Sequence, residues 1–285
     1  MRPTWLLFAL ITTVFWGVWG AFIEVPEKAG FPATLGYSVW ALTMIPCSLS
    51  ALAIAGWKLD HSARQIAYGS AVGFLGAGGQ LVLFEALRFG PAYLVFPIIS
   101  LYPVLTVLLA YGFLKERART KAWVGVMLAF PAMALLSWQP PSSSAGAVRL
   151  WLPLTFAVFL AWGIQAYVMK VSTGMMCEES VFFYMMATGV VLIPLAVLMT
   201  DFARPINWGP RGPWLAAVIQ VLNAMGALTL VYAMRYGKAM IVAPMTALAP
   251  VLTVILSLLL YRVVPETAVV VGMVIAAVAI YLMAE

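Results

Sequence analysis

The sequence has very little charge, a single histidine and two cysteines. Of its 285 residues, 9% are charged and 64% are apolar, whereas a soluble domain averages about 25% charged residues. So few charges cannot cover a water-facing surface, which excludes a soluble enzyme. His61 alone leaves no His-based triad or zinc site, and Cys47 and Cys177 lie in or beside apolar runs, so neither a disulfide framework nor a metal site is indicated. We expect no catalytic residues, no metal and no cofactor.

The sequence also lacks a nucleotide-binding loop. The glycines between residues 69 and 79 follow no predicted strand and precede no Gly-Lys-Ser/Thr. They lie within an apolar run, where close helix packing explains them better. ATP-driven transport by this chain alone is therefore excluded.

What the sequence has instead is ten apolar runs. A bilayer span needs about 20 apolar residues, and backbone polar groups in lipid must be paired within their own segment, which favours helices. We therefore predict an all-α integral membrane protein with ten transmembrane helices. The runs are 3–24, 34–56, 66–87, 92–113, 121–138, 149–171, 180–200, 212–234, 239–261 and 266–284.

The positive charge has a use in a membrane. A net charge of +6 fits the excess of Lys and Arg that cytoplasmic loops carry, and it does not indicate a nucleic-acid partner. With the N-terminus inside, 10 of the 16 Lys and Arg residues fall on the cytoplasmic side and 6 on the other. We therefore expect a bacterial-type inner-membrane protein with both termini in the cytoplasm, in which Lys170 is an anchor that reaches the inner interface.

The strongest signal is an internal repeat. Residues 85–97 align with residues 232–244, and residues 103–106 align with residues 250–253, with prolines, glycines, an arginine and a threonine in register. The predicted organisation is an N-terminal five-helix repeat at 1–139, a linker at 140–148 and a C-terminal five-helix repeat at 149–285. Because five is odd, the two halves are expected to have opposite topology, which is typical of secondary transporters. A duplicated scaffold or assembly protein is the alternative.

The same motifs carry a family resemblance. The Trp-Gly pairs at 16–17 and 162–163, the Arg-Phe-Gly and Arg-Tyr-Gly turns, the two proline-rich runs and the basic exit Leu114-Lys115-Glu116-Arg117 resemble the drug/metabolite transporter superfamily, EamA-like branch. The resemblance covers essentially the whole chain. It implies ten helices around a central cavity lined mainly by the first, third, fourth, sixth, eighth and ninth spans. In one departure, the Glu that usually follows the ninth span aligns with Val263, and Glu266 lies three residues later.

Four prolines inside apolar runs are candidate gating residues. Each removes a backbone hydrogen bond and tends to kink its helix. They are spaced six apart in both halves, so matching hinges are expected, and fixed curvature for packing is the alternative. The four are Pro97, Pro103, Pro244 and Pro250.

Polar and aromatic side chains in mid-span are candidate ligand contacts. An amide in lipid faces a cavity or another helix, and an aromatic ring stacks on a planar ligand or faces a cation. The predicted substrate-binding residues are Trp16, Trp19, Gln80, Tyr102, Gln165 and Asn223. Interhelical hydrogen bonding is the alternative role for the amides. Trp40, Trp162 and Tyr167 are further aromatic candidates for the cavity wall.

The resulting hypothesis is a secondary-active transporter that works by alternating access on a small polar or amphipathic metabolite. The resemblance favours export of an amino acid or a related metabolite. Its partners are then the solute, the lipid bilayer and protons as a candidate coupling ion, with Glu24 at the end of the first run as candidate carrier. The alternatives are an uncoupled facilitator or exchanger, a flippase of a lipid-linked substrate and, last, a membrane-embedded enzyme.

Overall fold

A computed structural model describes all residues except 1–3, 118, 137–147, 262–265 and 285. The predicted linker at 140–148 therefore lies almost wholly outside the described residues. Throughout the described ranges the chain is helical and contains no strand, which confirms the all-α prediction. The elements are α1 (Thr4–Phe22), α2 (Val25–Lys28), α3 (Ala33–Ile54), α4 (Ala63–Phe89), α5 (Ala92–Ile99), α6 (Pro103–Phe113), α7 (Thr120–Leu136), α8 (Val148–Thr173), α9 (Glu178–Val191), α10 (Ile193–Leu198), the short π-helical turn η1 (Pro210–Trp214), α11 (Leu215–Tyr236), α12 (Ala239–Thr246), α13 (Ala249–Tyr261) and α14 (Thr267–Ala284).

Eight helical segments in the described part of the chain are long and apolar enough to cross a bilayer. They match eight of the ten predicted runs and make this a multi-pass membrane protein. The remaining two runs form the shorter helices α7 and α14, so ten spans stay a prediction. Large apolar side chains point outward, such as Ile54, 88% exposed, and Leu198, 83% exposed. Lipid can cover such a surface and water cannot.

The two proline-rich runs each fold as two helices. The run at 92–113 is divided into α5 and α6 by residues 100–102, and the run at 239–261 is divided into α12 and α13 by residues 247 and 248. The breaks occupy matching places in the two halves. Each is a short turn that interrupts the helix in the middle of an apolar segment.

The gating prolines flank these breaks. Pro97 lies in α5 and Pro244 in α12, and Pro103 is the first residue of α6. Pro250 falls at the start of α13, but its side chain lies outside the described residues. Proline has no backbone N–H, so the helical hydrogen-bond ladder cannot run through it. The hydroxyl of Ser100 donates to the carbonyl of Pro97 at 2.6 Å, so this buried acceptor at the first break is paired.

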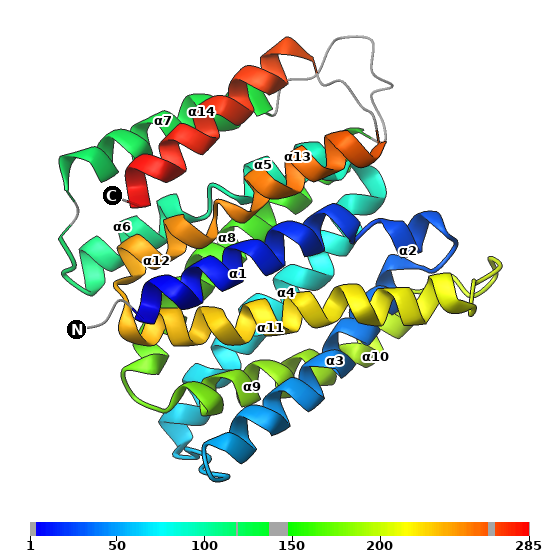
Figure 1. The fold of residues 1–285 in the computed structure, drawn as a ribbon, viewed down its shortest axis with the longest axis horizontal. Helices are drawn as coiled ribbons and strands as arrows, with labels where there is room; N and C mark the ends of the chain where they lie inside the picture. The colour runs from blue at the N-terminus through cyan, green and yellow to red at the C-terminus, as the bar shows by residue number, and fades with distance from the viewer. Residues whose placement is uncertain (1–3, 118, 137–147, 262–265, 285) are drawn as a thin grey trace.

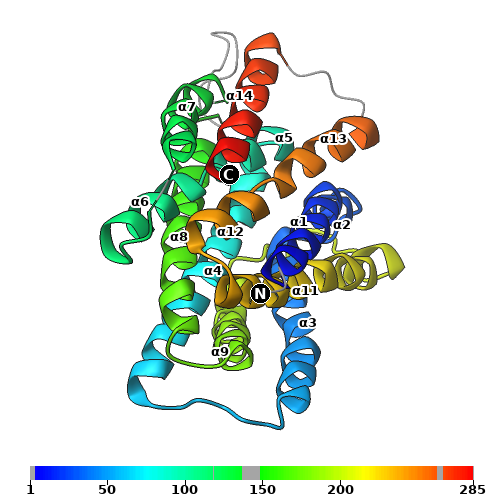
Figure 2. The same ribbon diagram turned by 60° about the vertical axis from the view of Figure 1, so that its left-hand side comes forward.

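The two halves of the chain make the same set of helix contacts. Helix α1 packs against α11 and α13, and α8 packs against α4 and α6. Helix α3 packs against α9, and α7 lies beside α14 along one edge of the molecule (Figure 1, Figure 2). The first long helix of each half, α1 or α8, thus packs against the third long helix and the broken helix of the other half.

Two indole N–H groups make hydrogen bonds across the contacts of α1 with α11 and of α8 with α4. Trp16 on α1 donates through Nε1 to the carbonyl of Asn223 on α11 at 3.3 Å, and Trp162 on α8 donates in the same way to the carbonyl of Gly76 on α4 at 3.4 Å. Trp162 lies 146 residues after Trp16, and Asn223 lies 147 residues after Gly76. The repeated tryptophans therefore link the two halves through matched hydrogen bonds.

Two threonines make a second matched pair of links. The hydroxyl of Thr253 donates to the carbonyl of Gly17 at 3.0 Å, and that of Thr106 donates to the carbonyl of Gly163 at 3.0 Å. All four residues are buried, and both bonds join one half of the chain to the other. The repeated Pro-Val-Leu-Thr and Trp-Gly motifs thus have a packing role.

Candidate functional site

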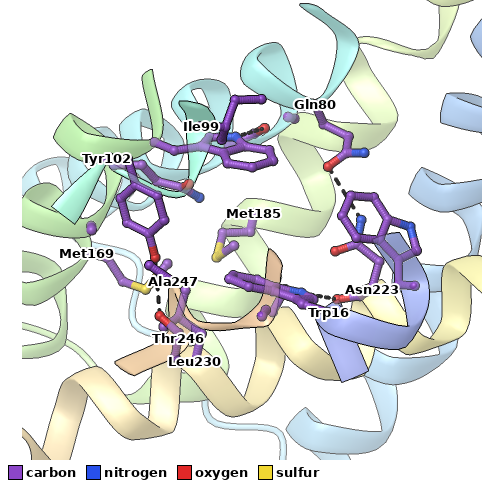
Figure 3. Close-up of a pocket in the computed structure, with 18 of the residues that line it drawn as sticks. Trp16, Gln80, Ile99, Tyr102, Met169, Met185, Asn223, Leu230, Thr246 and Ala247 are labelled. Carbon is purple, nitrogen blue, oxygen red and sulfur yellow. Dashed lines mark hydrogen bonds between the residues drawn. The ribbon is translucent and has the colours of Figure 1, made fainter. Parts of the chain in front are cut away.

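A cavity lies at the centre of the molecule, where the breaks of the two proline-rich segments meet the middles of the other helices (Figure 3). Its empty space, including the open mouth, is about 910 Å³, a size common among small-molecule sites. The lining residues are Trp16, Trp19, Trp40, Met44, Gly73, Gly76, Ala77, Gln80, Phe96, Ile99, Ser100, Tyr102, Trp162, Gln165, Ala166, Met169, Met185, Asn223, Ala227, Leu230, Thr246, Ala247, Ala249 and Thr253.

All six residues predicted to bind substrate line this one cavity. They come from α1, α4, α8, α11 and the segment between α5 and α6. Their binding role stays a prediction, but they are brought together as expected. Trp40 and Trp162 also line the cavity, whereas Tyr167 does not and packs against Phe113, with ring centroids 5.9 Å apart.

Two further helices contribute to the wall, and of their lining residues Trp40 was a candidate from the sequence, whereas Met44 and Met185 were missed. Trp40 and Met44 come from α3, and Met185 comes from α9. Methionine in an apolar run gives no polar signal, so nothing in the sequence distinguishes Met44 or Met185 from lipid-facing residues. Their unbranched, polarisable side chains suit an adaptable apolar wall.

The amide side chains form a row along one face of α4. The side chain of Gln165 lies over Gly76, so close that a Cβ on Gly76 would meet Gln165 Nε2 at 2.2 Å. Gln80 is four residues further along α4, on the same helical face. Asn223 Nδ2 donates to Gln80 Oε1 at 3.4 Å, a long hydrogen bond (Figure 3).

Three of the tryptophans that line the cavity, Trp16, Trp19 and Trp162, are held in place by hydrogen bonds. Besides Trp16 and Trp162, Trp19 donates through Nε1 to Gln220 Oε1 at 2.9 Å and packs edge-on against Phe96, with ring centroids 5.9 Å apart. Gln220 does not line the cavity, so its amide orients an aromatic residue that does. These bonds leave the cavity with fixed aromatic walls.

Tyr102 links the two breaks across the cavity. Its hydroxyl lies 3.1 Å from the hydroxyl of Thr246, at the end of α12 (Figure 3). Tyr102 lies at the break between α5 and α6 and Thr246 at the break between α12 and α13. A movement of one broken segment relative to the other must therefore change this contact.

Two nitrogen donors in the cavity wall have no partner in the described part of the chain. They are Gln80 Nε2 and Trp40 Nε1, both buried. Gln165, half-buried, makes no hydrogen bond to any other described residue. Polar groups without partners are costly in a membrane interior. They are therefore candidates for pairing with a ligand or with water.

No charged side chain lines the cavity within the described ranges. Glu24, the predicted proton carrier, lies between α1 and α2, away from the lining residues, and its Oε2 is 2.6 Å from Lys28 Nζ. The described residues also contain no group of three or more His, Cys, Asp or Glu that could hold a metal. The coupling role of Glu24 stays a prediction.

The three gating prolines whose side chains the structure describes, Pro97, Pro103 and Pro244, do not line the central cavity. Pro97 borders a separate apolar crevice between α5, α13 and α14, and Pro103 and Pro244 are buried. Ser100, the first residue of the first break, borders both the crevice and the cavity. The gating role of the four prolines stays a prediction, and for these three it would have to reach the cavity through the breaks beside them.

Lys170 does not reach out as an interfacial anchor. Its Nζ donates to the carbonyls of Met234 and Gly237 at the end of α11, at 2.8 and 2.6 Å. In return, Arg235 on α11 donates to the carbonyl of Thr173, the last residue of α8. Each helix therefore caps the C-terminus of the other with a cation, the charge that a helix C-terminus favours.

Acidic residues at the start of α9 complete this cluster. Glu178 Oε1 lies 3.6 Å from Arg235 Nε, and Glu179 accepts a hydrogen bond from the hydroxyl of Tyr232. The cluster therefore ties together one end of α8, α9 and α11. A sequence reading could not find it, because it depends on which helix ends meet.

Comparisons with known proteins agree with this arrangement. The model of the EamA-like transporter family matches residues 3–138 and again residues 149–284. An uncharacterised protein of Methanocaldococcus jannaschii is 30% identical over 112 residues, which cover 39% of this chain and 77% of that protein. Protein LicB of Haemophilus influenzae is 28% identical over 135 residues, 46% of each chain. One solved crystal structure shares the fold with a TM-score of 0.74 and 19% identity, covering 100% of this chain and 99% of that one.

Proposed function

Because the chain belongs to the EamA-like transporter family, whose members are membrane transporters and not enzymes, we propose that it is a secondary transporter of a small polar or amphipathic metabolite, such as an amino acid. The solute crosses through the central cavity by alternating access. The observation that carries this proposal is the cavity itself, which collects the mid-span amides and aromatics beside two broken helices. A cavity near the middle of discontinuous helices is typical of such transporters.

We further propose ten spans arranged as two inverted repeats of five. The matching contacts of α1 with α11 and α13 and of α8 with α4 and α6 support this arrangement. The matched indole bonds of Trp16 and Trp162 support it as well. A two-fold axis in the membrane plane relates the two halves and passes close to the cavity. The termini lie in the cytoplasm, and the membrane is a bacterial inner membrane.

Alternating access needs two ends that open in turn. At the end where α8 and α11 terminate, Lys170 and Arg235 cap each other's helices. The matching positions at the ends of α1 and α4 are Glu24, whose carboxylate pairs with Lys28 at 2.6 Å, and Arg88, which pairs with Glu85 on its own helix at 2.9 Å. The reciprocal caps hold the cytoplasmic end closed, and the breaks beside Pro97 and Pro244 are the hinges.

A lipid-linked substrate is the second candidate. The crevice between α5, α13 and α14 favours it, because nine of the ten described residues that line it are apolar and Ser100 borders both this crevice and the cavity. An acyl chain could follow that route while its polar head occupies the cavity. A flippase of this kind moves no water-soluble metabolite.

Counterflow in proteoliposomes tests the proposal. Vesicles that contain the purified protein are loaded with an unlabelled metabolite mixture, and uptake of each labelled member is measured. We expect concentrative exchange of at least one soluble metabolite, lost in Gln80→Ala and Asn223→Ala and kept in the control Gly78→Ala, which changes α4 outside the cavity lining. Movement of lipid-linked probes without exchange of any soluble solute would favour the flippase.

A further inference from the structure

We propose that the cavity selects solutes that carry no net charge and present a hydrogen-bond acceptor to Gln80 and Trp40. This inference rests on the proposed transport function and names the chemistry that the cavity admits. It covers both neutral molecules and zwitterions, in which opposite charges cancel. Solutes with a net positive or a net negative charge are excluded.

The first argument is the absence of a counter-charge. All described residues that line the cavity are apolar, aromatic, hydroxylic or amidic. The cation nearest to a lining residue in the sequence is Lys170, and its ammonium group donates hydrogen bonds to the carbonyls of Met234 and Gly237. A net charge taken from water into a low-dielectric site is costly unless an opposite charge or strong hydrogen bonds compensate it. An anion or a cation meets no opposite charge here, and a zwitterion brings its own.

The second argument is the type of unpaired polar group. Gln80 Nε2 and Trp40 Nε1 are donors, buried with 3% and 5% residue exposure, and neither has a partner in the described part of the chain. The Trp40 ring cannot turn away easily. The benzo edge of Trp40 packs against Gly189, where a Cβ would lie 3.6 Å from Trp40 Cζ3. On another side the ring packs against Tyr37, with ring centroids 5.3 Å apart. Two donors that lack partners call for acceptor oxygens on the ligand.

This second argument also separates an uncharged ligand from a bare cation. Aromatic faces attract cations, and Trp16, Trp19 and Trp162 supply such faces around the cavity. A cation without an acceptor, however, leaves both unpaired donors unsatisfied. The ligand that satisfies the donors and uses the aromatic wall combines an acceptor oxygen with an apolar or aromatic part.

Gln165 supplies the complementary group. It lies over Gly76, one helical turn of α4 from Gln80, and makes no hydrogen bond to another described residue. An amide side chain offers both donors and an acceptor. A ligand donor can therefore meet the Gln165 oxygen while a ligand acceptor meets Gln80. The row along α4 recognises a ligand that has both kinds of group.

Four compounds with one aromatic side chain test the inference. They are L-phenylalanine, a zwitterion; N-acetyl-L-phenylalaninamide, neutral; L-phenylalaninamide, a cation; and N-acetyl-L-phenylalanine, an anion. Binding to the purified protein in detergent is measured by calorimetry at about pH 6, where an α-amino group is protonated. We expect the zwitterion and the neutral compound to bind at least about tenfold more tightly than the two ions. Equal or tighter binding of either ion overturns the inference.

Variants assign the recognition to particular groups. We expect Trp40→Phe, which keeps the ring and removes the donor, and Gln80→Leu to weaken binding of the neutral compound by about tenfold each. Trp123→Phe is the matched control, because Trp123 on α7 packs edge-on against Tyr111 on α6, with ring centroids 5.1 Å apart, and is not among the residues that line the cavity. Gln165→Glu is expected to raise affinity for the cationic compound, since it adds the missing counter-charge. Unchanged affinities in Trp40→Phe and Gln80→Leu contradict the assignment.

The experiment separates this inference from the proposed function. If the ions bind as well as the uncharged compounds and counterflow occurs, the transporter stands and the charge rule fails. If no compound of the four binds to a protein that is active in counterflow, the inference is again overturned. If neither binding nor counterflow is found with a folded protein, the proposed function fails with it.

Discussion

Replacing Gly79 with alanine is the sharpest test of how the two halves are packed. A Cβ at Gly79 would lie 2.5 Å from Trp162 Nε1 and 2.8 Å from Trp162 Cδ1. Trp162 is a rigid ring fixed by its bond to Gly76, so it cannot yield like the end of a flexible chain. The preceding residue, Gly78, has nothing within 4 Å of its Cβ position. Two adjacent glycines of one helix therefore differ only in what faces them.

The magnitudes give the two variants opposite signs. Alanine in place of glycine within a helix raises the free energy of unfolding by about 0.5–1 kcal/mol. We expect Gly78→Ala to show this increase. Gly79→Ala makes the same gain but adds overpacking of about 1–3 kcal/mol. It also strains the Trp162 hydrogen bond, worth about 1 kcal/mol. We therefore expect Gly79→Ala to be less stable than wild type by about 1–3 kcal/mol.

The assay is reversible unfolding in mixed detergent micelles, followed by far-ultraviolet circular dichroism. A dichroism signal is preferable to fluorescence because Trp162 itself would contribute to fluorescence. Gly226→Ala on α11 provides a replicate, since its Cβ would lie 2.5 Å from Trp16 Nε1. If Gly79→Ala and Gly226→Ala are as stable as Gly78→Ala, the tryptophans do not pack as described and the matched links between halves are refuted.

Three other perturbations have defined outcomes. Lys170→Met leaves the carbonyls of Met234 and Gly237 without a cationic donor, so we expect a loss of about 2–4 kcal/mol in the same unfolding assay; full stability would contradict the cap. Burial raises the pKa of the Cys177 thiol. Its alkylation by iodoacetamide near neutral pH should therefore be slower than that of free cysteine and should rise with pH past the ordinary thiol range, whereas a rate equal to that of free cysteine contradicts the burial. Glu24→Gln should abolish pH-driven flux and spare counterflow, and an unchanged pH dependence would remove Glu24 as the coupling group.

Sequence reasoning located the site better than it explained it. The six predicted cavity residues could be found because an amide or a tyrosine in lipid needs a polar neighbour, and the cavity is where such neighbours meet. The same reasoning could not assign Trp16 its hydrogen bond to the Asn223 carbonyl. It also took Lys170 for an anchor, because only tertiary packing decides that the end of α11 lies within its reach.

The matched positions Gly76 and Asn223 explain how a symmetric frame can hold an asymmetric site. At both positions the hydrogen bond that links the two halves involves only the backbone carbonyl, which accepts an indole N–H from the opposite half. This link between the halves therefore does not determine which side chain stands at either position. With glycine at 76, the space is filled by Gln165, and with asparagine at 223, the amide reaches Gln80 at 3.4 Å. Because backbone bonds tolerate any side chain, the two halves could diverge at these positions without loss of packing, and the polar groups of the cavity arise there.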